Sequence, residues 1–170
     1  MLRNFVFTLE IRPCEIGAGV GEPRAKAAED ELSDVFAVIC GDEYYEFDIM
    51  PAFSLLEKKN ADCVIITTDC RNPLEYGIVK SDDDGRITGF IEKPSWSGVI
   101  SGRINTGIYI MKKSLLGILE KDKAADFSQD LFPVMLEKGM TLLSYHTEGK
   151  WCDIGNPKSF YDINMYLSGK

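Results

Sequence analysis

The sequence has few of the features that mark secreted, membrane-bound or zinc-binding proteins. Its five cysteines are widely and irregularly spaced and include no C-x-x-C pair, a pattern that argues against a zinc site and favours a reducing compartment. No apolar run approaches the roughly 20 residues that cross a bilayer. The first residues lack the apolar core of a signal peptide. These absences predict a cytoplasmic protein that does not bind a membrane.

Basic residues and histidine are also scarce. The chain has 19 basic against 27 acidic residues and a formal net charge of -8. Nucleic-acid binding through phosphate neutralisation needs a basic surface, so this balance argues against a nucleic-acid partner. The single histidine, His146, lies on an alternating segment that predicts a strand, and no Ser-His-Asp or Cys-His arrangement is supported. A length of 170 residues fits one domain. Residues 1–170 are therefore expected to form a single domain.

Short apolar runs alternate with segments of strong helix formers. Strands are predicted at residues 5–11, 35–40, 62–68, 76–80, 86–92, 104–111 and 141–146, and helices at residues 24–32, 50–59, 114–121, 126–138 and 156–167. This alternation predicts an α/β fold with a mostly parallel sheet flanked by helices. The run Asp82-Asp83-Asp84-Gly85 is a strong turn signal. It predicts a hairpin, and hence a small antiparallel insertion.

Two aspartates stand out as candidate metal ligands. Asp42 comes directly after the apolar run 35–40 and Gly41, and open α/β sheets bind ligands at the carboxyl ends of their strands. A carboxylate there can hold a divalent cation on a phosphate. Asp153, in the segment W-C-D-I-G, offers a second carboxylate for the same metal. Taken alone, these segments also fit an Asp that caps a turn and a turn that enters a helix.

Further polar candidates lie at the ends of other predicted strands. Lys93 offers a point charge for a phosphate, and Glu92 beside it can accept hydrogen bonds from sugar hydroxyls. Asn105 can bind a hydroxyl, and Gly107 can let a flat ring approach closely. An exposed ion pair and a β-bulge glycine are the ordinary alternatives for these positions.

A glycine-rich segment lies near the N-terminus. Gly17, Gly19 and Gly21 suggest the dinucleotide-binding pattern G-x-G-x-x-G, but that pattern needs a glycine at position 22, where this chain has Glu22. The spacing excludes the pattern. A loop of backbone N–H donors near a nucleotide base remains an open interpretation of the segment.

Five longer segments occur in a fixed order along the chain. They are N-P-L-E-Y-G-I-V at residues 72–79, G-R-I-T-G-F-I-E-K-P at 85–94, I-N-T-G-I-Y at 104–109, D-F-S-Q-D-L-F-P at 126–133 and W-C-D-I-G-N at 151–156. In this order and spacing, they resemble the sugar-1-phosphate nucleotidyltransferase family, which makes nucleotide sugars. The closest likeness is to mannose-1-phosphate guanylyltransferases. Glucose-1-phosphate thymidylyl-, uridylyl- and adenylyltransferases share much of the pattern.

The resemblance implies a Rossmann-like nucleotidyltransferase fold and a reaction between a nucleoside triphosphate and a sugar 1-phosphate, with a product of the GDP-mannose type. It implies that Asp42 and Asp153 are catalytic residues that hold Mg²⁺, and that Lys93 is a catalytic residue that binds the sugar phosphate. The resemblance also implies two sets of binding residues. The substrate would be bound by Tyr76, Gly77, Glu92, Asn105, Thr106 and Gly107, and the nucleotide by Gly17 and Gly19.

The sequence departs from the family pattern near its N-terminus. The family's triphosphate loop, of the type G-x-G-T-R-L-x-P-L-T, does not occur among these 170 residues. We therefore expect a sheet that is truncated at the N-terminal side, with an unpaired edge covered by a second copy of the chain or by another partner. A catalytically impaired fragment, or a non-catalytic subunit that binds sugar phosphates or nucleotide sugars, is the alternative function. A glycosyltransferase-type domain is a third reading, for which the chain has no convincing D-x-D motif at a strand end.

Overall fold

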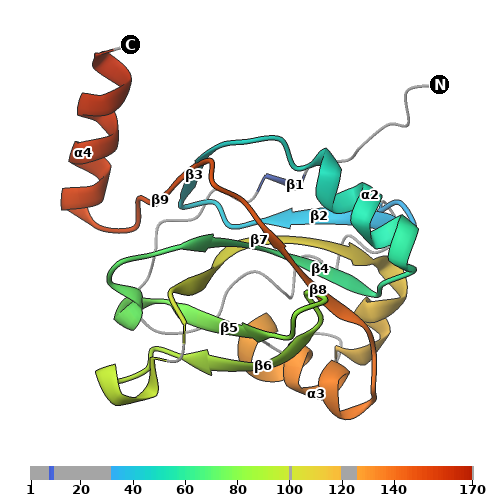
Figure 1. Cartoon of the computed structure of the whole chain (residues 1–170). Helices are drawn as coiled ribbons and strands as arrows, with labels where there is room; N and C mark the ends of the chain where they lie inside the picture. The colour runs from blue at the N-terminus through green and yellow to red at the C-terminus, as the bar shows by residue number, and fades with distance from the viewer. Residues whose placement is uncertain (1–7, 10–31, 100, 120–125, 170) are drawn as a thin grey trace.

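The centre of the molecule is a seven-stranded sheet. The computed structural model describes residues 8–9, 32–99, 101–119 and 126–169. In these residues the strand order is β1-β2-β7-β4-β8, and the hairpin β5-β6 is attached to β7 (Figure 1). The strands are β1 (Thr8–Leu9), β2 (Val35–Ile39), β4 (Cys63–Asp69), β5 (Gly77–Ser81), β6 (Ile87–Glu92), β7 (Arg103–Lys112) and β8 (Leu142–His146). The six strands predicted after residue 32 are confirmed, each within one residue at either end, as is the α/β class.

The strand directions correct the prediction of a mostly parallel sheet. β7 runs antiparallel to β4 along one edge and to β2 and β5 along the other, and β5 is antiparallel to β6. Among the described strands, only β1–β2 and β4–β8 are parallel pairs. The reason is that the β5-β6 hairpin is not a separate insertion. The chain leaves it into β7, which returns through the middle of the sheet between β2 and β4.

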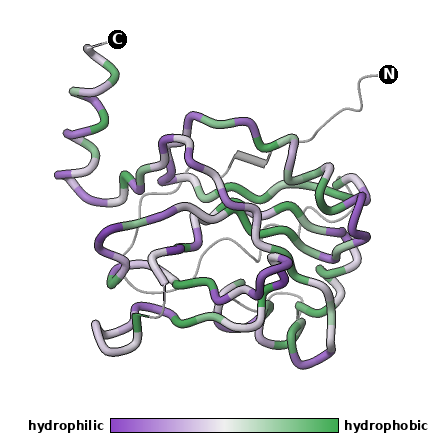
Figure 2. The backbone as a smooth tube through the Cα atoms, viewed as in Figure 1, coloured by the Kyte–Doolittle hydropathy of each residue, from purple (hydrophilic) through white to green (hydrophobic). Residues whose placement is uncertain are grey.

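The sheet has an apolar layer on each face. Cys63 and Ile65 belong to one buried cluster, and their neighbours Val64 and Ile66 belong to the other, as the alternation of side chains along β4 requires. Helix α2 (Met50–Lys59) covers the Val64 face with its own buried side chains. Helix α3 (Phe132–Glu137) and the turns before it cover the opposite face. Figure 2 shows the hydrophobic residues concentrated along these inner strands.

The helical segments that follow β7 differ in type from the prediction. Residues 114–121 were expected to form an α-helix, but the described part is a 3-10 helix, Lys113–Ile118, which contains the weak helix former Gly117. Residues 126–138 form a π-helical turn, Phe127–Leu131, and then α3. Pro133 lies in the first turn of α3, where its missing N–H removes no helix hydrogen bond. The proline therefore begins the α-helix rather than interrupting it.

A second, two-stranded sheet was not expected from the sequence. Its strands β3 (Glu43–Glu46) and β9 (Lys150–Asp153) are antiparallel, with Glu43 opposite Asp153. β9 leads into α4 (Pro157–Ser168), which confirms the helix predicted at 156–167 and projects away from the central sheet in Figure 1. Two further 3-10 turns are Pro73–Glu75 and Trp96–Gly98. Among the described helices, none combines the length and apolar character needed to cross a membrane.

Three sequence predictions lie outside the described residues. They are the loop with the glycine-rich segment at 12–23, the helix at 24–32 except for its last residue, and most of the strand at 5–11, of which the structure describes β1.

Replacement of Phe132 by alanine tests the α3 layer. Phe132 is 0% exposed and stacks on Phe90 and Phe127, with ring centroids 5.2 and 6.0 Å away. Its loss leaves a cavity, so we expect the free energy of unfolding to fall by about 3–5 kcal/mol. Denaturant unfolding measures this change. Phe160→Ala is the control, because Phe160 is 56% exposed and should change stability by only about 0.5 kcal/mol. Equal losses in the two variants would contradict the described core.

Candidate active site

Asp42 and Asp153 are brought together by the pairing of β3 with β9. Asp42 lies in the turn between β2 and β3, and its carbonyl oxygen accepts a 2.8 Å hydrogen bond from the Ile154 N–H. A Cβ atom added to Gly155 would lie 2.9 Å from Asp153 Oδ1 and 3.3 Å from Asp42 Oδ2. Both carboxylates therefore border the same glycine. The two residues are more than a hundred positions apart in the sequence, and the fold brings their side chains close together.

The surroundings of Asp153 favour a bound cation. Burial raises the pKa of its carboxyl group, and the Asp42 carboxylate raises it further, while the Gly155 N–H, 2.6 Å from Oδ1, lowers it. A divalent cation between the two carboxylates would offset both their repulsion and the cost of burial. Carboxylate oxygens are also the ligands that Mg²⁺ prefers. The residues present therefore fit the expected metal.

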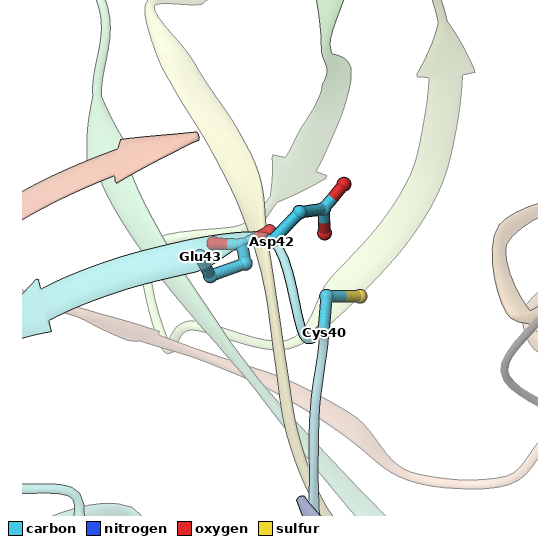
Figure 3. A group of neighbouring side chains, drawn as sticks. All are labelled: Cys40, Asp42 and Glu43. Carbon is cyan, nitrogen blue, oxygen red and sulfur yellow. The ribbon is translucent and has the colours of Figure 1, made fainter. Parts of the chain in front are cut away.

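Two further ligand atoms lie beside Asp42. Ligand atoms of Cys40, Asp42 and Glu43 are all within 4.8 Å of one another, and Figure 3 shows the three side chains on the segment that joins β2 to β3. Cys40, at the end of the apolar run 35–40, is half-buried. Glu43 was not singled out at all. The only sequence signal for it was a second acidic residue directly after Asp42.

Glu43 is tied to β9 and to β7. Its carboxylate accepts a hydrogen bond from Trp151 Nε1, which also lies 3.0 Å from the Thr106 carbonyl oxygen. Burial raises the pKa of the Glu43 carboxyl well above its usual value. The Trp151 hydrogen bond lowers it, and the charges of Asp42 and Asp153 raise it again. The Glu43 carboxylate, at the start of β3, is thus held by the Trp151 indole.

A second group of predicted residues meets at the ends of β5, β6 and β7. Gly77 is opposite Glu92 in the β5-β6 ladder, and a Cβ atom at Gly77 would lie 2.8 Å from Glu92 Oε2 and 3.9 Å from Asn105 Cβ. Burial raises the pKa of Glu92, Asp126 raises it further, and Lys93 lowers it. Lys93 follows β6 with a positive φ of 41°. A carboxylate, an amide and a lysine are therefore neighbours here.

The turn around Asn105 is fixed by its own side chain. Asn105 Nδ2 donates to Tyr109 Oη at 2.9 Å, and its Oδ1 accepts the Gly107 N–H at 3.0 Å. Gly107 has a φ of +74°, and a Cβ atom there would lie 2.9 Å from Cys40 Sγ. Glycine is therefore required, because an L side chain would be strained and would collide.

Thr106 was expected to contact the substrate. Its side chain is fully buried, and its hydroxyl donates to the Ile66 carbonyl at 2.8 Å. This hydroxyl sits at the irregularity in the β4–β7 ladder between Ile65 and Thr67, where it satisfies a backbone acceptor. The side chain supports the sheet, and a contact between Thr106 and the substrate stays a prediction.

Tyr76 connects the two groups of residues. Its ring meets the Trp151 ring edge-on, with centroids 5.4 Å apart. Burial raises the pKa of its hydroxyl to about 12, with Asp153 as the next cause. Tyr76 thus lies between the Asp42–Asp153 pair and the Gly77–Glu92 pair. The predicted nucleotide-binding residues Gly17 and Gly19 lie outside the described residues.

Sequence comparisons match the chain to one family. The model of the family described as "Nucleotidyl transferase" matches residues 22–169. A UTP–glucose-1-phosphate uridylyltransferase of Synechocystis is 31% identical over 148 residues, which are 86% of this chain and 38% of that protein. The mannose-1-phosphate guanylyltransferase catalytic subunit beta of Drosophila pseudoobscura is 32% identical over 166 residues, 97% of this chain and 43% of that protein. The chain thus spans about two fifths of the length of these relatives.

Solved structures agree with these matches. HddC from Yersinia pseudotuberculosis has a TM-score of 0.73 and 25% identity, and the match covers 90% of this chain and 64% of that one. The UTP-bound UGPase of Acinetobacter baumannii has a TM-score of 0.70 at 18% identity over 84% of this chain and 54% of that one, a likeness of fold alone. The family model covers most of the sequence, and the described fold is similar to that of these structures. The chain belongs to the nucleotidyl transferase family.

Proposed function

We propose that the chain provides the cation-binding and sugar-phosphate-binding part of a nucleotidyl-transfer site. In the reaction, an oxygen of a sugar 1-phosphate forms a bond to the α-phosphorus of a nucleoside triphosphate. The bond from that phosphorus to the bridging oxygen breaks, and pyrophosphate leaves with the electron pair. The observation that carries the proposal is that Asp42 and Asp153 both border Gly155, beside the Gly77–Glu92 pair.

The residues have separate parts in this scheme. Asp42 and Asp153 hold Mg²⁺, which neutralises phosphate charge when it is bound. Lys93 attracts the sugar phosphate as a point charge, and Glu92 accepts hydrogen bonds from the sugar hydroxyls. Asn105 orients the sugar, and Gly77 leaves room for it. The protein forms no covalent bond to the substrates, so its contribution is positioning and charge stabilisation.

We favour mannose 1-phosphate and GTP as the substrates. This choice rests on the segments E-K-P-S-W, I-N-T-G-I-Y and D-F-S-Q-D-L-F-P, which look most like those of guanylyltransferases. The names of similar proteins include uridylyl-, guanylyl- and adenylyltransferases. UTP, ATP and dTTP with glucose 1-phosphate are therefore the competing pairs. Gly17 and Gly19 stay the proposed contacts to the base.

A second candidate is a subunit that binds sugar phosphates without turning them over. It is favoured by one sequence observation, namely that no segment of the type G-x-G-T-R-L-x-P-L-T occurs in the chain. The first candidate instead requires that the cations that stabilise the departing pyrophosphate come from another chain or from sequence outside these 170 residues. Each such group typically contributes on the order of 100-fold or more to the rate.

Pyrophosphate release separates the two candidates. The purified chain is incubated with Mg²⁺, mannose 1-phosphate or glucose 1-phosphate, and each of the four triphosphates in turn. Release with one pair would identify the substrates. Folded protein that binds a sugar phosphate by calorimetry, yet releases no pyrophosphate with any pair, would support the second candidate.

Loss of either aspartate should remove cation-dependent function. We expect Asp42→Ala and Asp153→Ala each to lower Mg²⁺-dependent turnover by about 100-fold or more, because each removes a proposed ligand. Mn²⁺ binding, measured by electron paramagnetic resonance, should weaken in parallel. Asp83→Ala is the matched control, since Asp83 is exposed in the β5-β6 turn and should bind and react like the wild type. Near-normal values in both site variants would refute the metal assignment.

A methyl group at Gly77 should impair binding of the sugar phosphate. The new Cβ atom would lie 2.8 Å from Glu92 Oε2, so the carboxylate must move. We expect the dissociation constant for the sugar phosphate to rise by roughly 10- to 100-fold, measured by calorimetry. Gly89→Ala on the neighbouring strand is the control, because a Cβ atom there meets nothing within 4 Å. If the two variants bind equally well, Glu92 does not contact the sugar.

Two expectations from the sequence remain predictions. One is that a second copy of the chain, or another partner, covers an edge of the sheet. The described sheet has β1 and β8 at the two ends of its strand order. Light scattering measures the assembly, and a monomer at all concentrations would count against it. The other is the cytoplasmic location.

A further inference from the structure

Glu43 lies where three parts of the chain meet. It begins β3 and pairs with Asp153 of β9. Its carboxylate accepts the Trp151 indole N–H. A Cβ atom on Gly107 of β7 would lie 3.1 Å from Glu43 Cδ, so the carboxyl group packs directly on the β7 backbone.

The β3-β9 ribbon depends on contacts of this kind. It is a separate sheet of four-residue strands, and among the described residues no ladder pairs it with the seven-stranded sheet. An isolated two-stranded ribbon is at best marginally stable. Its position relative to β7 must therefore be set by other contacts. One of these runs from Glu43 through the Trp151 indole to the Thr106 carbonyl, 3.0 Å from Nε1.

Asp153 lies close to this contact along the chain. It lies two residues after Trp151 on the same short strand, and Trp151 also supports the Tyr76 ring. We propose that Glu43 is a positioning residue, whose carboxyl group holds the Trp151 indole against β7 and thereby keeps Asp153 beside Asp42. The inference rests on the proposed function, which assigns the two aspartates to the cation.

A direct role for Glu43 on the metal is the competing explanation. Its carboxylate lies within 4.8 Å of a ligand atom of Asp42. The two roles differ in what they require of the side chain. A positioning role needs only an oxygen that accepts the indole N–H, which glutamine supplies. A ligand role needs the charged carboxylate that hard divalent cations prefer.

Two readouts on the free protein test the proposal. Trp96→Phe leaves Trp151 as the only tryptophan, since the chain has two and Trp96 is 63% exposed. In this background, acrylamide quenching of Trp151 fluorescence reports how firmly the indole is held. Mn²⁺ alone, titrated by electron paramagnetic resonance, reports the aspartate pair. The variants are Glu43→Ala, Glu43→Gln and the exposed control Glu137→Ala.

The expected pattern separates the two roles. Glu43→Ala should increase the quenching constant of Trp151 and weaken Mn²⁺ binding by about 10- to 100-fold, the range seen when residues that orient metal ligands are lost. Glu43→Gln should keep both values within about threefold of the W96F protein, and Glu137→Ala should not change them. The Gln variant preserves the volume and the acceptor, so it separates a ligand role from a positioning role even if Glu43→Ala fails to fold.

Three outcomes would overturn the inference. Weak Mn²⁺ binding in Glu43→Gln with unchanged quenching would make Glu43 a metal ligand. Unchanged quenching and binding in folded Glu43→Ala would show that the contact positions nothing. Increased quenching with normal Mn²⁺ binding would show that the position of Trp151 does not affect the aspartate pair. If the W96F protein itself binds no Mn²⁺, the proposed function fails, and the quenching values alone then show whether Glu43 holds the indole.

Discussion

The backbone of β7 has to be satisfied on both of its edges, and the arrangement of the site follows from that requirement. Its N–H and C=O groups pair with β4 along one edge and with β2 and β5 along the other. Beyond the β2 ladder, the Cys40 N–H still donates to the Gly107 carbonyl at 3.2 Å. The residues just after β2 are therefore held against the Asn105–Gly107 turn. A shift of β7 would leave N–H and C=O groups unpaired in a buried strand, and the free-energy cost of burying unpaired groups opposes such a shift.

The site gathers acidic groups that are partly removed from water: Glu43 and Asp153 are half-buried, whereas Glu92 is exposed. Burial is the largest cause of the raised pKa of Glu43, of Glu92 and of Asp153. Such an arrangement works against stability in the absence of a positive ligand, because each charge loses hydration without a full partner. It is typical of functional sites, where strong binding of a cation or a phosphate–cation pair compensates for the unfavourable apo state.

The sequence was sufficient for elements whose signal is local. The apolar run at 62–68 and the helix formers at 50–59 identify β4 and α2, because burial on both faces and helix propensity can be read from neighbouring residues. Strand direction could not be read in this way, since it depends on where β7 returns. β3 and β9 were missed because E-Y-Y-E and K-W-C-D are short and mixed in polarity. The role of Glu43 was hidden because its partner, Trp151, is distant in sequence.

The parallel pairing of β4 with β8 has a consequence for how the chain is made. Residues 63–67 find their partners only at residues 142–146, so a long loop must close before this edge of the sheet exists. During synthesis from the N-terminus, β4 therefore emerges from the ribosome well before β8. Its apolar run, with one edge unpaired, is then exposed to other nascent chains. We infer that the chain is most vulnerable to aggregation in this interval, when a chaperone would protect it best.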